Sequence, residues 1–193
     1  MTAFTNENKD FLRELMKKKR KYLSDAEVFE KSKKITQNLF SLKEINQAQN
    51  IALYISFNNE VETKQIIEKL WKQGKNVFVP VMKEESEEHL YFAKIDSFEG
   101  LIENNKGILE PKEKVFIPPN EIELFIVPGV AFDKKGNRIG WGKGFYDKFF
   151  NFNKIVAKKI GLAFEFQIVE SISHKAHDVK MDFVVTEKKV FQN

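Results

Sequence analysis

Residues 122–150 read IELFIVPGVAFDKKGNRIGWGKGFYDKFF, and they pass from an apolar run through a glycine-rich segment into aromatic residues. The apolar run over 122–132 is typical of a buried strand, which we expect to end at Pro128-Gly129. A helix is expected to begin near Lys143, beyond most of the glycines. A buried strand, a glycine turn and a helix in this order indicate one unit of an α/β fold.

The same alternation continues outward from this stretch towards both ends of the chain. Apolar residues recur at helical spacing within 8–23, and Phe11 and Tyr22 are counted on that apolar face. The letters SDAE form a capping-box signature, so a second helix is expected from Ser24 to Phe40. The remaining expected elements are a helix over 61–75 with a stop at Gly74 and strands over 50–57, 76–82, 89–95, 155–164 and 182–186.

Apolar strands that alternate with helices imply a mostly parallel β-sheet with helices on both faces, which is a three-layer, Rossmann-like α/β fold. We expect a single domain over residues 1–193, because the chain shows no internal repeat and no linker. Ligands of such folds bind beyond the carboxyl ends of the strands. The glycine segment follows a strand and precedes a helix, so it should lie on that rim.

The composition excludes several classes of protein. Hydrophobic residues make up 42% of the chain and charged residues 31%, which is an ordinary balance for a globular protein. No stretch approaches the roughly 20 apolar residues that cross a bilayer, and the N-terminus lacks the apolar core of a signal peptide. The absence of cysteine excludes disulfides, thiolate metal sites and a cysteine nucleophile. A monomeric, cytoplasmic protein without a membrane partner is the simplest expectation.

The formal net charge of +4 comes from the N-terminal part of the chain. Residues 1–34 hold ten of the 32 basic and six of the 28 acidic residues, which leaves 22 of each sign in the rest. A neutral body is not that of a cationic nucleic-acid binder, so no nucleic-acid partner is expected. The basic run KKKRK at 17–21 lies within the apolar periodicity, and we interpret it as an exposed helix face.

The glycine segment has the composition of an anion cradle. Gly140, Gly142 and Gly144 allow the backbone to turn through positive φ and allow a ligand to approach closely. The unpaired N–H groups of the helix that follows would point into this turn and attract anions. Arg138 and Lys143 add positive charge, so the segment is a candidate polyphosphate site. Its spacing matches neither the Walker A loop nor the GxGxxG fingerprint.

Asp147 follows these cations and would repel a phosphate if it stood alone. Mg²⁺ placed between them converts this repulsion into attraction, because Mg²⁺ is commonly held by one or two carboxylates together with phosphate oxygens. The alternative is local: the glycines form a tight turn between strand and helix, and Asp147 favours the helix N-terminus. The spacing alone leaves both interpretations open.

The letters PGVAFDKKGNRIGWGKGFYDKFF at 128–150 resemble the signature of the 5-formyltetrahydrofolate cyclo-ligase family, also called 5,10-methenyltetrahydrofolate synthetases. Four further segments are similar to motifs of this family and occur in the family's order, so the likeness spans nearly the whole chain. These segments are KDFLRELMKKKRKYLS at 9–24, YISFNNEVET at 54–63, GILEP at 107–111 and HDVKMDFVVTE at 177–187.

The resemblance implies an enzyme that converts 5-formyltetrahydrofolate to 5,10-methenyltetrahydrofolate while it hydrolyses ATP to ADP and phosphate in the presence of Mg²⁺. It implies catalytic roles for Arg138 and Lys143 and a metal site at Asp147 and Asp178. The residues implied to contact folate are Ile55, Glu60, Trp141 and Phe145. The residues implied to contact ATP are Lys9, Arg13, Arg138, Ile139, Gly140, Trp141, Gly142, Lys143, Gly144, Phe145 and Tyr146.

Elementary geometry agrees with part of these implied roles. Lys9 and Arg13 lie four residues apart, so they share a helix face at the border of the apolar stripe, alongside Arg20. There a cation can pack its stem while its head reaches a neighbouring crevice, although a solvated helix face is the alternative. Glu60 follows the end of an expected strand, on the ligand-binding rim. Its alternative role is that of an acid at the start of the next helix.

Three other positions in the implied sites differ in how firmly the resemblance fixes their roles. Phe145 stands where relatives often have Tyr, so this ring has no hydroxyl to offer a ligand. Trp141 occupies a variable position of the motif. Asp178 has His174 and His177 nearby, which leaves a mixed histidine and carboxylate metal site open. Mg²⁺ prefers oxygen ligands, which favours Asp178 over the two histidines.

The implied reaction transfers a phosphoryl group to the formyl oxygen, after which folate N10 attacks and phosphate departs. The protein would align the reactants and neutralise charge, and no enzyme nucleophile is required. A sugar-phosphate isomerase or a CoA-transferase is a rival enzyme, of broadly similar architecture and without a need for ATP. An RNA-binding module that uses the N-terminal basic helix is a rival from another class.

Overall fold

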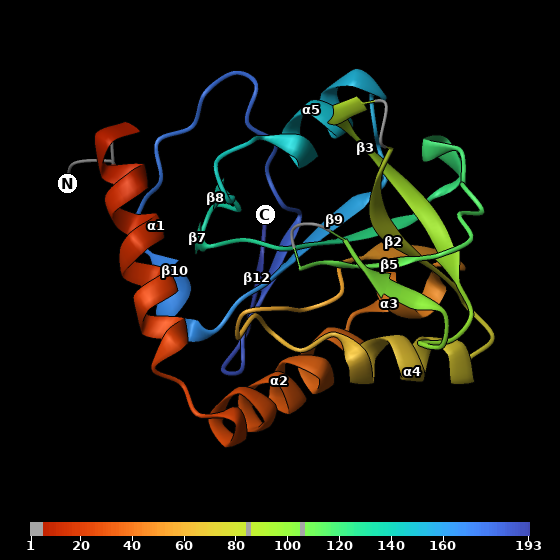
Figure 1. Cartoon of the computed structure of the whole chain (residues 1–193). Helices are drawn as coiled ribbons and strands as arrows, with labels where there is room; N and C mark the ends of the chain where they lie inside the picture. Colours follow the sequence, from red (N-terminus) through yellow and green to blue (C-terminus); the bar gives the residue numbers. More distant parts are fainter. Residues whose placement is uncertain (1–5, 84–85, 105–106) are drawn as a thin grey trace.

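The computed structural model describes the backbone of residues 6–83, 86–104 and 107–193. Within these ranges, seven strands form one sheet in the order β12-β11-β9-β6-β1-β2-β3 (Figure 1). The strands of this sheet are β1 (Asn50–Leu53), β2 (Asn76–Lys83), β3 (Ser86–Ile95), β6 (Leu124–Val127), β9 (Lys158–Leu162), β11 (Phe183–Val185) and β12 (Val190–Gln192).

The five inner strands of the sheet are parallel, and the two edge strands β3 and β12 are antiparallel to their neighbours. This arrangement confirms the mostly parallel sheet that the alternation of helices and strands predicts. The chain adds β2 on one side of β1 and then returns to add β6 on the other side, with Leu53 paired to Ile126. The β1–β6 boundary is therefore the point where strand order reverses, and ligands of open α/β sheets bind beyond the carboxyl ends of the strands at such points.

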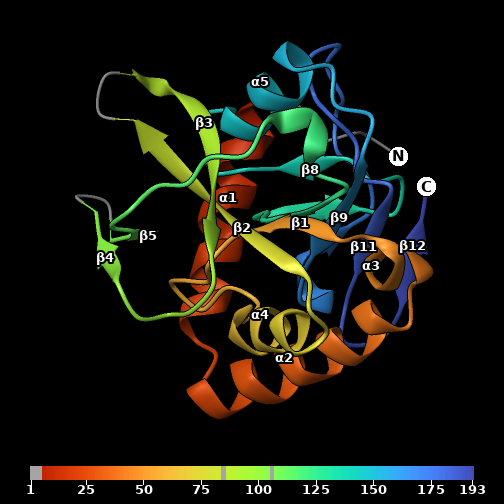
Figure 2. The same ribbon diagram turned by 90° about the vertical axis from the view of Figure 1, so that its right-hand side faces the viewer.

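Helices lie on both faces of the sheet, as expected. They are α1 (Asn6–Lys21), α2 (Asp25–Phe40), α3 (Lys43–Gln47), α4 (Lys64–Lys72) and α5 (Phe145–Phe152). Short 3₁₀ helices lie at Pro119–Glu121 and Glu165–Gln167. Figure 2 shows α2, α3 and α4 on one side and α5 on the other. Among the described residues, no helix is long and apolar enough to span a bilayer.

Each face of the sheet has its own apolar core. The core beneath α2 and α4 centres on aliphatic side chains such as Ile35, Leu39 and Ile66, all fully buried. The core beneath α5 is aromatic, with Phe125 and Phe149 making edge-on contacts at 5.8 Å between ring centroids. Burying apolar side chains on both faces holds the parallel sheet between its helices.

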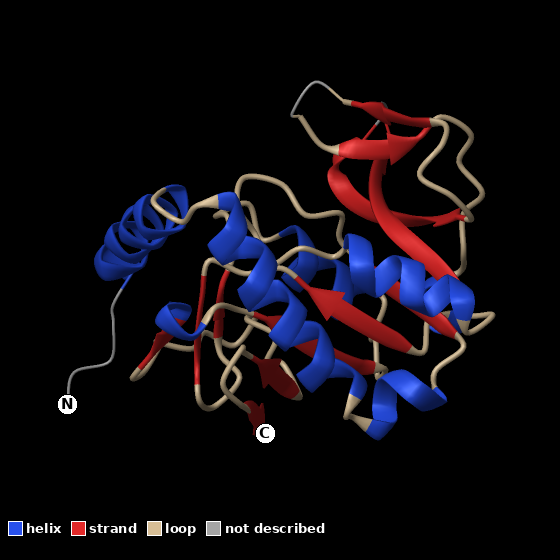
Figure 3. Ribbon diagram, turned by 90° about the horizontal axis from the view of Figure 1, so that it is seen from below, coloured by secondary structure: helices blue, strands red, loops and turns tan. Residues whose placement is uncertain are grey.

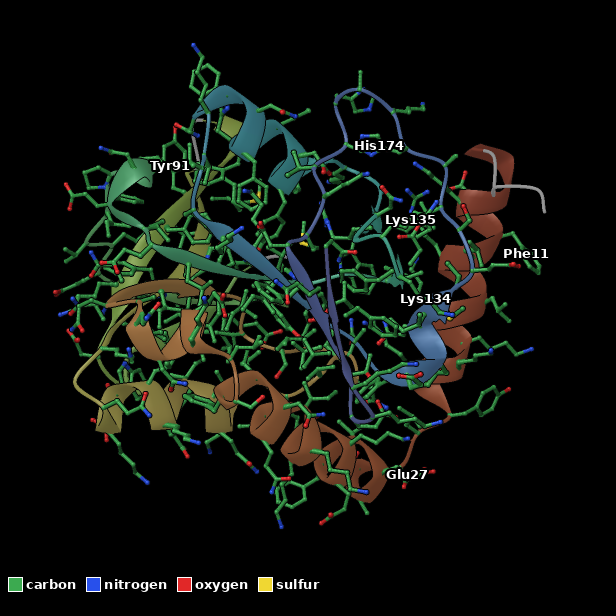
Figure 4. All side chains as sticks on the ribbon, turned by 180° about the vertical axis from the view of Figure 1, so that it is seen from behind. Phe11, Glu27, Tyr91, Lys134, Lys135 and His174 are labelled. Atoms are coloured by element: carbon green, nitrogen blue, oxygen red, sulfur yellow. The ribbon has the colours of Figure 1, made fainter. Side chains whose placement is uncertain are left out.

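Helix α1 stands apart from these two layers, at the end of the molecule that carries the N-terminus (Figure 3). It docks through Leu12 and Met16, both 3% exposed, onto a small apolar cluster that includes Val130 and Ile139. Phe11 and Tyr22 do not join this contact, because they are 64% and 76% exposed. Figure 4 shows Phe11 projecting away from the body, so the apolar face of α1 is narrower than predicted.

The apolar run over 122–132 is divided between two strands. Strand β6 ends at Val127, before Pro128, and the chain then leaves the main sheet as β7 (Ala131–Asp133). A Cβ at Gly129 would lie 2.3 Å from the Phe132 ring, so this bend requires glycine. Strand β7 pairs with β8 (Arg138–Ile139) and β10 (Ile168–Val169) in a separate sheet. The expected end of the strand at Pro128-Gly129 is therefore confirmed, and the later part of the apolar run belongs to β7, which contacts α1.

Several other boundaries differ from the expected ones. The strand expected over 50–57 ends at Leu53, and the helix expected from 61 begins at Lys64. Helix α5 begins at Phe145 because Gly144 is left-handed, with φ of 67°, a conformation that a helix interior does not admit. Helix α3, strand β12 and the β4–β5 hairpin, formed by Leu101–Glu103 and Leu109–Pro111, were not expected.

Candidate functional site

A cavity of about 860 Å³ opens at the carboxyl edge of the sheet, next to the β1–β6 boundary. Its walls come from α1, the loop after β1, strands β2 and β3, the β5 region, the glycine segment, α5 and the loop that precedes β11. All of the residues that the resemblance implies for ATP, folate and metal line this one cavity. Their individual roles stay predictions, but the fold brings them together.

The glycine segment forms one end of the cavity, which we call the glycine end; it comprises residues 138–147. Gly142 and Gly144 have φ of 111° and 67°, and Gly144 precedes the first turn of α5. A Cβ at Gly144 would meet nothing within 4 Å, so the requirement is conformational and not one of space. The first turn of α5 lines the cavity, where its backbone N–H groups are available to an anion.

Arg138 is the most firmly held cation of the glycine end, with 5% of its side chain exposed. Its Nη2 donates to Asp147 Oδ2 at 2.8 Å, and its Nη1 donates to the Pro128 carbonyl at 3.2 Å. Its Nε has no protein partner among the described residues. The side chain therefore links the end of β6 to α5 in a fixed position, and it keeps hydrogen-bonding capacity for a ligand.

Two cations of α1 reach the same end of the cavity. Lys9 Nζ lies 3.2 Å from Asp178 Oδ2, and Arg13 Nε donates to the Gly140 carbonyl at 2.9 Å. Arg13 also pairs with Asp10. The helix face that Lys9 and Arg13 share is thus turned to the site, and the alternative of a wholly solvated face is wrong.

The remaining predicted members of the glycine end differ in exposure. Lys143 is exposed at the mouth, with its Nζ 5.8 Å from the centroid of the Phe145 ring. Ile139 is 1% exposed and packs in the cluster under α1, so it has mainly its backbone to offer a ligand. The hydroxyl of Tyr146 is buried and has no protein partner in the described part of the chain. Burial raises the pKa of Tyr146, so this hydroxyl remains a proton donor at neutral pH.

Asp147 and Asp178 can be tested as magnesium ligands. Asp147 Oδ1 accepts the Val179 N–H at 3.0 Å, which places the loop before β11 against α5. Burial opposes the charged form of Asp178, but hydrogen bonds from the Lys175 N–H and from Lys9 hold the pKa of Asp178 below its usual value. Both carboxylates line the cavity and keep lone pairs for a cation, so they fit an ion that phosphate oxygens also bind.

The histidines near Asp178 do not complete a metal site. His174 and His177 are both exposed, and His177 Nε2 lies 3.7 Å from Asp178 Oδ1. Figure 4 shows His174 on the long loop before β11. Within the described residues, no group of three or more histidine and carboxylate side chains is arranged to hold a metal ion. The mixed histidine and carboxylate site is therefore not supported.

The other part of the cavity, which we call the acid end, begins at Glu60. Its side chain is 4% exposed, and its Oε1 accepts the Trp141 Nε1–H at 3.3 Å. Burial raises the pKa of Glu60 from its usual 4.5 to about 7, against the opposing charge of Arg20 and hydrogen bonds from Phe57 and Trp141. Helix α4 begins only at Lys64, so Glu60 is not a helix-start acid.

The acid end continues along strands β2, β3 and β5. Its wall is mostly apolar and includes Ile55, Pro80, Met82, Leu90, Ile108 and Leu109. Glu110 adds a second buried carboxylate, whose Oε1 accepts the Asn104 Nδ2–H at 2.7 Å and whose Oε2 pairs with Lys114 Nζ at 3.0 Å. An apolar wall with a few convergent polar groups suits a flat organic ring.

Sequence reasoning left several members of the site without a role. Glu110 belongs to the GILEP motif at 107–111. This motif is part of the resemblance to the family, but no binding or catalytic role was predicted for its residues. Tyr54 is buried and donates to the Val61 carbonyl at 3.1 Å, yet it precedes the residues that were singled out. Arg20 was noted only as a neighbour of Lys9 and Arg13. The helical spacing of Arg13 and Arg20, two turns apart, was the available signal.

Comparisons with known proteins agree on one family. A sequence model described as the 5-formyltetrahydrofolate cyclo-ligase family matches residues 5–187. The chain is 38% identical over 173 residues to the 5-formyltetrahydrofolate cyclo-ligase of Haemophilus influenzae, with 88% of this chain and 92% of that protein covered. It is 30% identical over 181 residues to the enzyme of that name from Escherichia coli K12, with 92% and 100% covered.

Solved structures give the same result. The structure of Aquifex aeolicus 5,10-methenyltetrahydrofolate synthetase is similar to this chain with a TM-score of 0.82 and 34% sequence identity, and 95% of this chain and 92% of that chain are covered. A synthetase of the same name from Mycoplasma pneumoniae is similar with a TM-score of 0.75 and 26% identity, over 93% and 98% of the two chains.

Proposed function

Because the chain belongs to the 5-formyltetrahydrofolate cyclo-ligase family, we propose that it closes the ring of 5-formyltetrahydrofolate to 5,10-methenyltetrahydrofolate at the expense of ATP. The products are the methenyl compound, ADP and phosphate. The relatives carry the name of this activity.

The chemistry requires that the formyl oxygen become a leaving group. We propose that the formyl oxygen attacks the γ-phosphorus of ATP, so that a C–O–P bond forms and ADP leaves. Folate N10 then attacks the formyl carbon and loses its proton. The C–O bond breaks with its electron pair on the departing phosphate, and the N5–CH–N10 amidinium remains. The protein's contribution is alignment and charge stabilisation.

One observation carries this proposal: the two ends of the cavity are continuous and chemically opposite. The glycine end offers backbone N–H groups and buried Arg138, which suit a triphosphate. The acid end offers an apolar wall and the carboxylate of Glu60, which suit a pterin with its ring N–H and amino donors. Ligands seated at both ends would have the γ-phosphate and the formyl group facing each other.

Within the glycine end, the residues divide between holding and catalysis. Lys9 and Arg13 approach from α1 and would contact the triphosphate. Arg138, Lys143 and the backbone of Gly140–Gly144 would stabilise the charge that develops on the transferred phosphoryl group. Mg²⁺, held by Asp147 and Asp178 together with phosphate oxygens, would neutralise further phosphate charge when it is bound.

Ile55 of the acid end and Phe145 of the glycine end would pack against the folate, and Glu60 would accept hydrogen bonds from it. Trp141 lies between the two ends and is 38% exposed, with its ring stacked on Phe57 at 5.6 Å between centroids. Phe145 lacks the hydroxyl that relatives often carry, so a polar contact from this ring is absent here. The neighbouring Tyr146 hydroxyl has no protein partner among the described residues, and we propose that it supplies a polar contact instead.

The direct test mixes the protein with 5-formyltetrahydrofolate and Mg-ATP. The methenyl product should appear by its near-ultraviolet absorbance, with one ADP and one phosphate released per product. A sugar-phosphate isomerase or a CoA-transferase would need no ATP, and product without ATP consumption would overturn the proposal. Added RNA should change neither rate nor stoichiometry. Monomeric state and cytoplasmic location stay predictions from the sequence.

The phosphorylated intermediate has its own test. With ¹⁸O in the formyl group, the label should leave in the released phosphate, because the C–O bond breaks after the O–P bond forms. Unlabelled phosphate would mean that the formyl oxygen is not phosphorylated, even if ATP is consumed.

A further inference from the structure

Arg20 lies behind Glu60, at the inner boundary between the two ends of the cavity. Its side chain is 3% exposed, and it is not among the residues that form the cavity wall. Its Nη1 lies 3.6 Å from Glu60 Oε1, and its guanidinium lies 4.9 Å from the centroid of the Trp141 ring. Trp141 Nε1–H closes the group with its own hydrogen bond to Glu60 Oε1.

The segment that carries Glu60 is fixed to the same end of α1. Asn59 Nδ2 donates to the Arg20 and Leu23 carbonyls at 3.1 Å and 3.2 Å. Asn58 and Asn59 both have positive φ, of 50° and 53°, a conformation that Asn tolerates better than most residues. The backbone of the Glu60 loop thus follows the C-terminal end of α1, while the N-terminal half of α1 holds the glycine segment through Arg13.

We propose that Arg20 is a positioning residue, which fixes the Glu60 carboxylate and the Trp141 indole as one unit at the junction of the two ends. Its consequence for turnover rests on the proposed function, whereas its effect on Glu60 and Trp141 does not. Arg suits this task because its planar guanidinium can stack on an indole while its N–H groups face a carboxylate. A lysine supplies the charge without the plane.

The charge of Arg20 matters because Glu60 is buried. The groups that face Glu60 are Arg20 from α1, the Phe57 N–H from its own loop, Trp141 from the glycine segment, and the tyrosines Tyr54 and Tyr146. Burial already raises the pKa of Glu60 to about 7, and Arg20 is the charge that opposes this rise. Without Arg20, Glu60 would hold its proton to higher pH, so that one of its oxygens would become a donor and the charge that strengthens its acceptor role would be lost.

The test compares Arg20→Met, which removes both the positive charge and the planar guanidinium, with Arg20→Lys, which retains the charge but not the planar group. The control is Lys19→Met, which removes one exposed charge from the same helix. The first readout is the fluorescence of Trp141 against pH, in a Trp71→Phe background so that Trp141 is the sole tryptophan of the chain. This titration needs no substrate and reports protonation of the carboxylate that the indole contacts.

We expect a fluorescence transition near pH 7 that disappears in Glu60→Gln. Arg20→Met should move the transition up by about one pH unit or more, because an opposite charge at this range shifts a carboxyl pKa by roughly that amount. Arg20→Lys should leave the transition near that of the parent but change the fluorescence intensity, since the stack is lost. Lys19→Met should change neither.

The second readout is kcat/KM for 5-formyltetrahydrofolate against pH. Arg20→Met should lose activity at neutral pH and recover most of it at about pH 9, where Glu60 is again ionised. In a Glu60→Gln background, Arg20→Met should add no more than about a twofold loss, because residues that act through one another are non-additive. A purely structural Arg20 would give equal losses at every pH and additive effects.

Failure of the inference is distinguishable from failure of the proposed function. If the parent protein does not turn over folate but Arg20→Met still shifts the fluorescence transition, the proposed function is overturned and the positioning role of Arg20 is retained. An unshifted transition in Arg20→Met overturns the inference, whatever the turnover. If Arg20→Met does not fold, Arg20→Lys decides, and a Trp141 fluorescence intensity in Arg20→Lys identical to that of Lys19→Met overturns the proposal.

Discussion

The two ends of the cavity are built in opposite ways. The glycine end comes mainly from one contiguous stretch, residues 138–147, in which each functional group is a few positions from the next. The acid end is assembled from the loop after β1, from β2 and β3, and from the region of β5, which are far apart in sequence. The difference shows that the proposed phosphate site is built from one local stretch, whereas the proposed ring site depends on the packed sheet.

The ends also differ in how their charges are compensated. At the glycine end the cations are paired at hydrogen-bonding distances, Arg138 with Asp147 at 2.8 Å and Lys9 with Asp178 at 3.2 Å. At the acid end Glu60 faces Arg20 at 3.6 Å, and burial dominates its pKa. Substitutions at the glycine end should therefore act by changing how well the charge of the ligand is neutralised. Substitutions at the acid end should act by changing the protonation of Glu60.

The largest effect is expected at the glycine end, for Arg138→Ala. We expect kcat to fall by about 10²–10³-fold, because a preorganised donor to the phosphoryl group is lost. Removing Arg138 also leaves Asp147 without its 2.8 Å partner, so some loss of stability should accompany it. Steady-state kinetics measures the fall in kcat, and thermal unfolding measures the loss of stability.

Lys134→Ala is the matched control for Arg138. Lys134 and Lys135 are exposed on the turn between β7 and β8, as Figure 4 shows, and lie outside the cavity wall. Wild-type kcat in Arg138→Ala would remove the basis for the glycine end as the phosphoryl-transfer site.

At the acid end, Glu60→Gln should lower kcat/KM for 5-formyltetrahydrofolate by about 10–10²-fold, since one charged hydrogen-bond acceptor is lost. The dissociation constant of Mg-ATP, measured by calorimetry, should stay within about twofold of wild type. The control is Glu62→Gln, two residues further on and outside the cavity wall. Equal losses of ATP and folate affinity would contradict the division into two ends.

Lys143 tests a weaker contact at the glycine end. Because Lys143 is exposed and screened by solvent, Lys143→Ala should lower kcat/KM for ATP by only about 3–10-fold, and by less at high salt. Lys135→Ala serves as the control of equal charge. A loss as large as that of Arg138→Ala, and independent of salt, would mean that solvent does not screen the charge of Lys143 when the ligands are bound.

The smallest effect concerns stability. Glu60 has a folded-state pKa of about 7 against its usual 4.5, so the folded chain binds the proton more tightly than the unfolded chain. This term therefore favours folding at low pH, and it is lost as pH rises through the folded pKa. Between about pH 5 and pH 8, the free energy of unfolding of wild type should fall relative to Glu60→Gln by on the order of 1–3 kcal/mol.

Denaturant unfolding of the two proteins at several pH values measures this difference. A constant gap would show that Glu60 titrates alike in both states. A gap that moves in the opposite direction would show that Arg20 outweighs burial and keeps Glu60 ionised.

Some of the fold and of the site follows from short-range patterns. The capping box at Ser24 is present, with Ser24 Oγ and the Glu27 side chain bonded as the letters SDAE predict. The parallel sheet follows from alternation of apolar runs and helices. The resemblance, confirmed by the family match over residues 5–187, brought in Glu60 and Asp178, whose positions carry no local signal strong enough alone.

The boundaries of the helices and strands and most of the acid end could not be predicted from short-range sequence patterns. The bend at Gly129 depends on the Phe132 ring that packs over it, and this ring belongs to a strand of another sheet. Glu110 is buried because the β4–β5 hairpin folds beside β2 and β3 (Figure 2). Such contacts join residues that are distant in the chain, and periodicity carries no information on them.

By itself, the sequence determined the glycine turn, the charges beside it and the order of helices and strands, because these depend on backbone freedom and on spacing within a few residues. Only the tertiary structure decided that α1 turns Arg13 towards Gly140 and Arg20 towards Glu60. A pKa or an ion pair is set by which groups exclude water from one another, and that arrangement arises when separate elements pack.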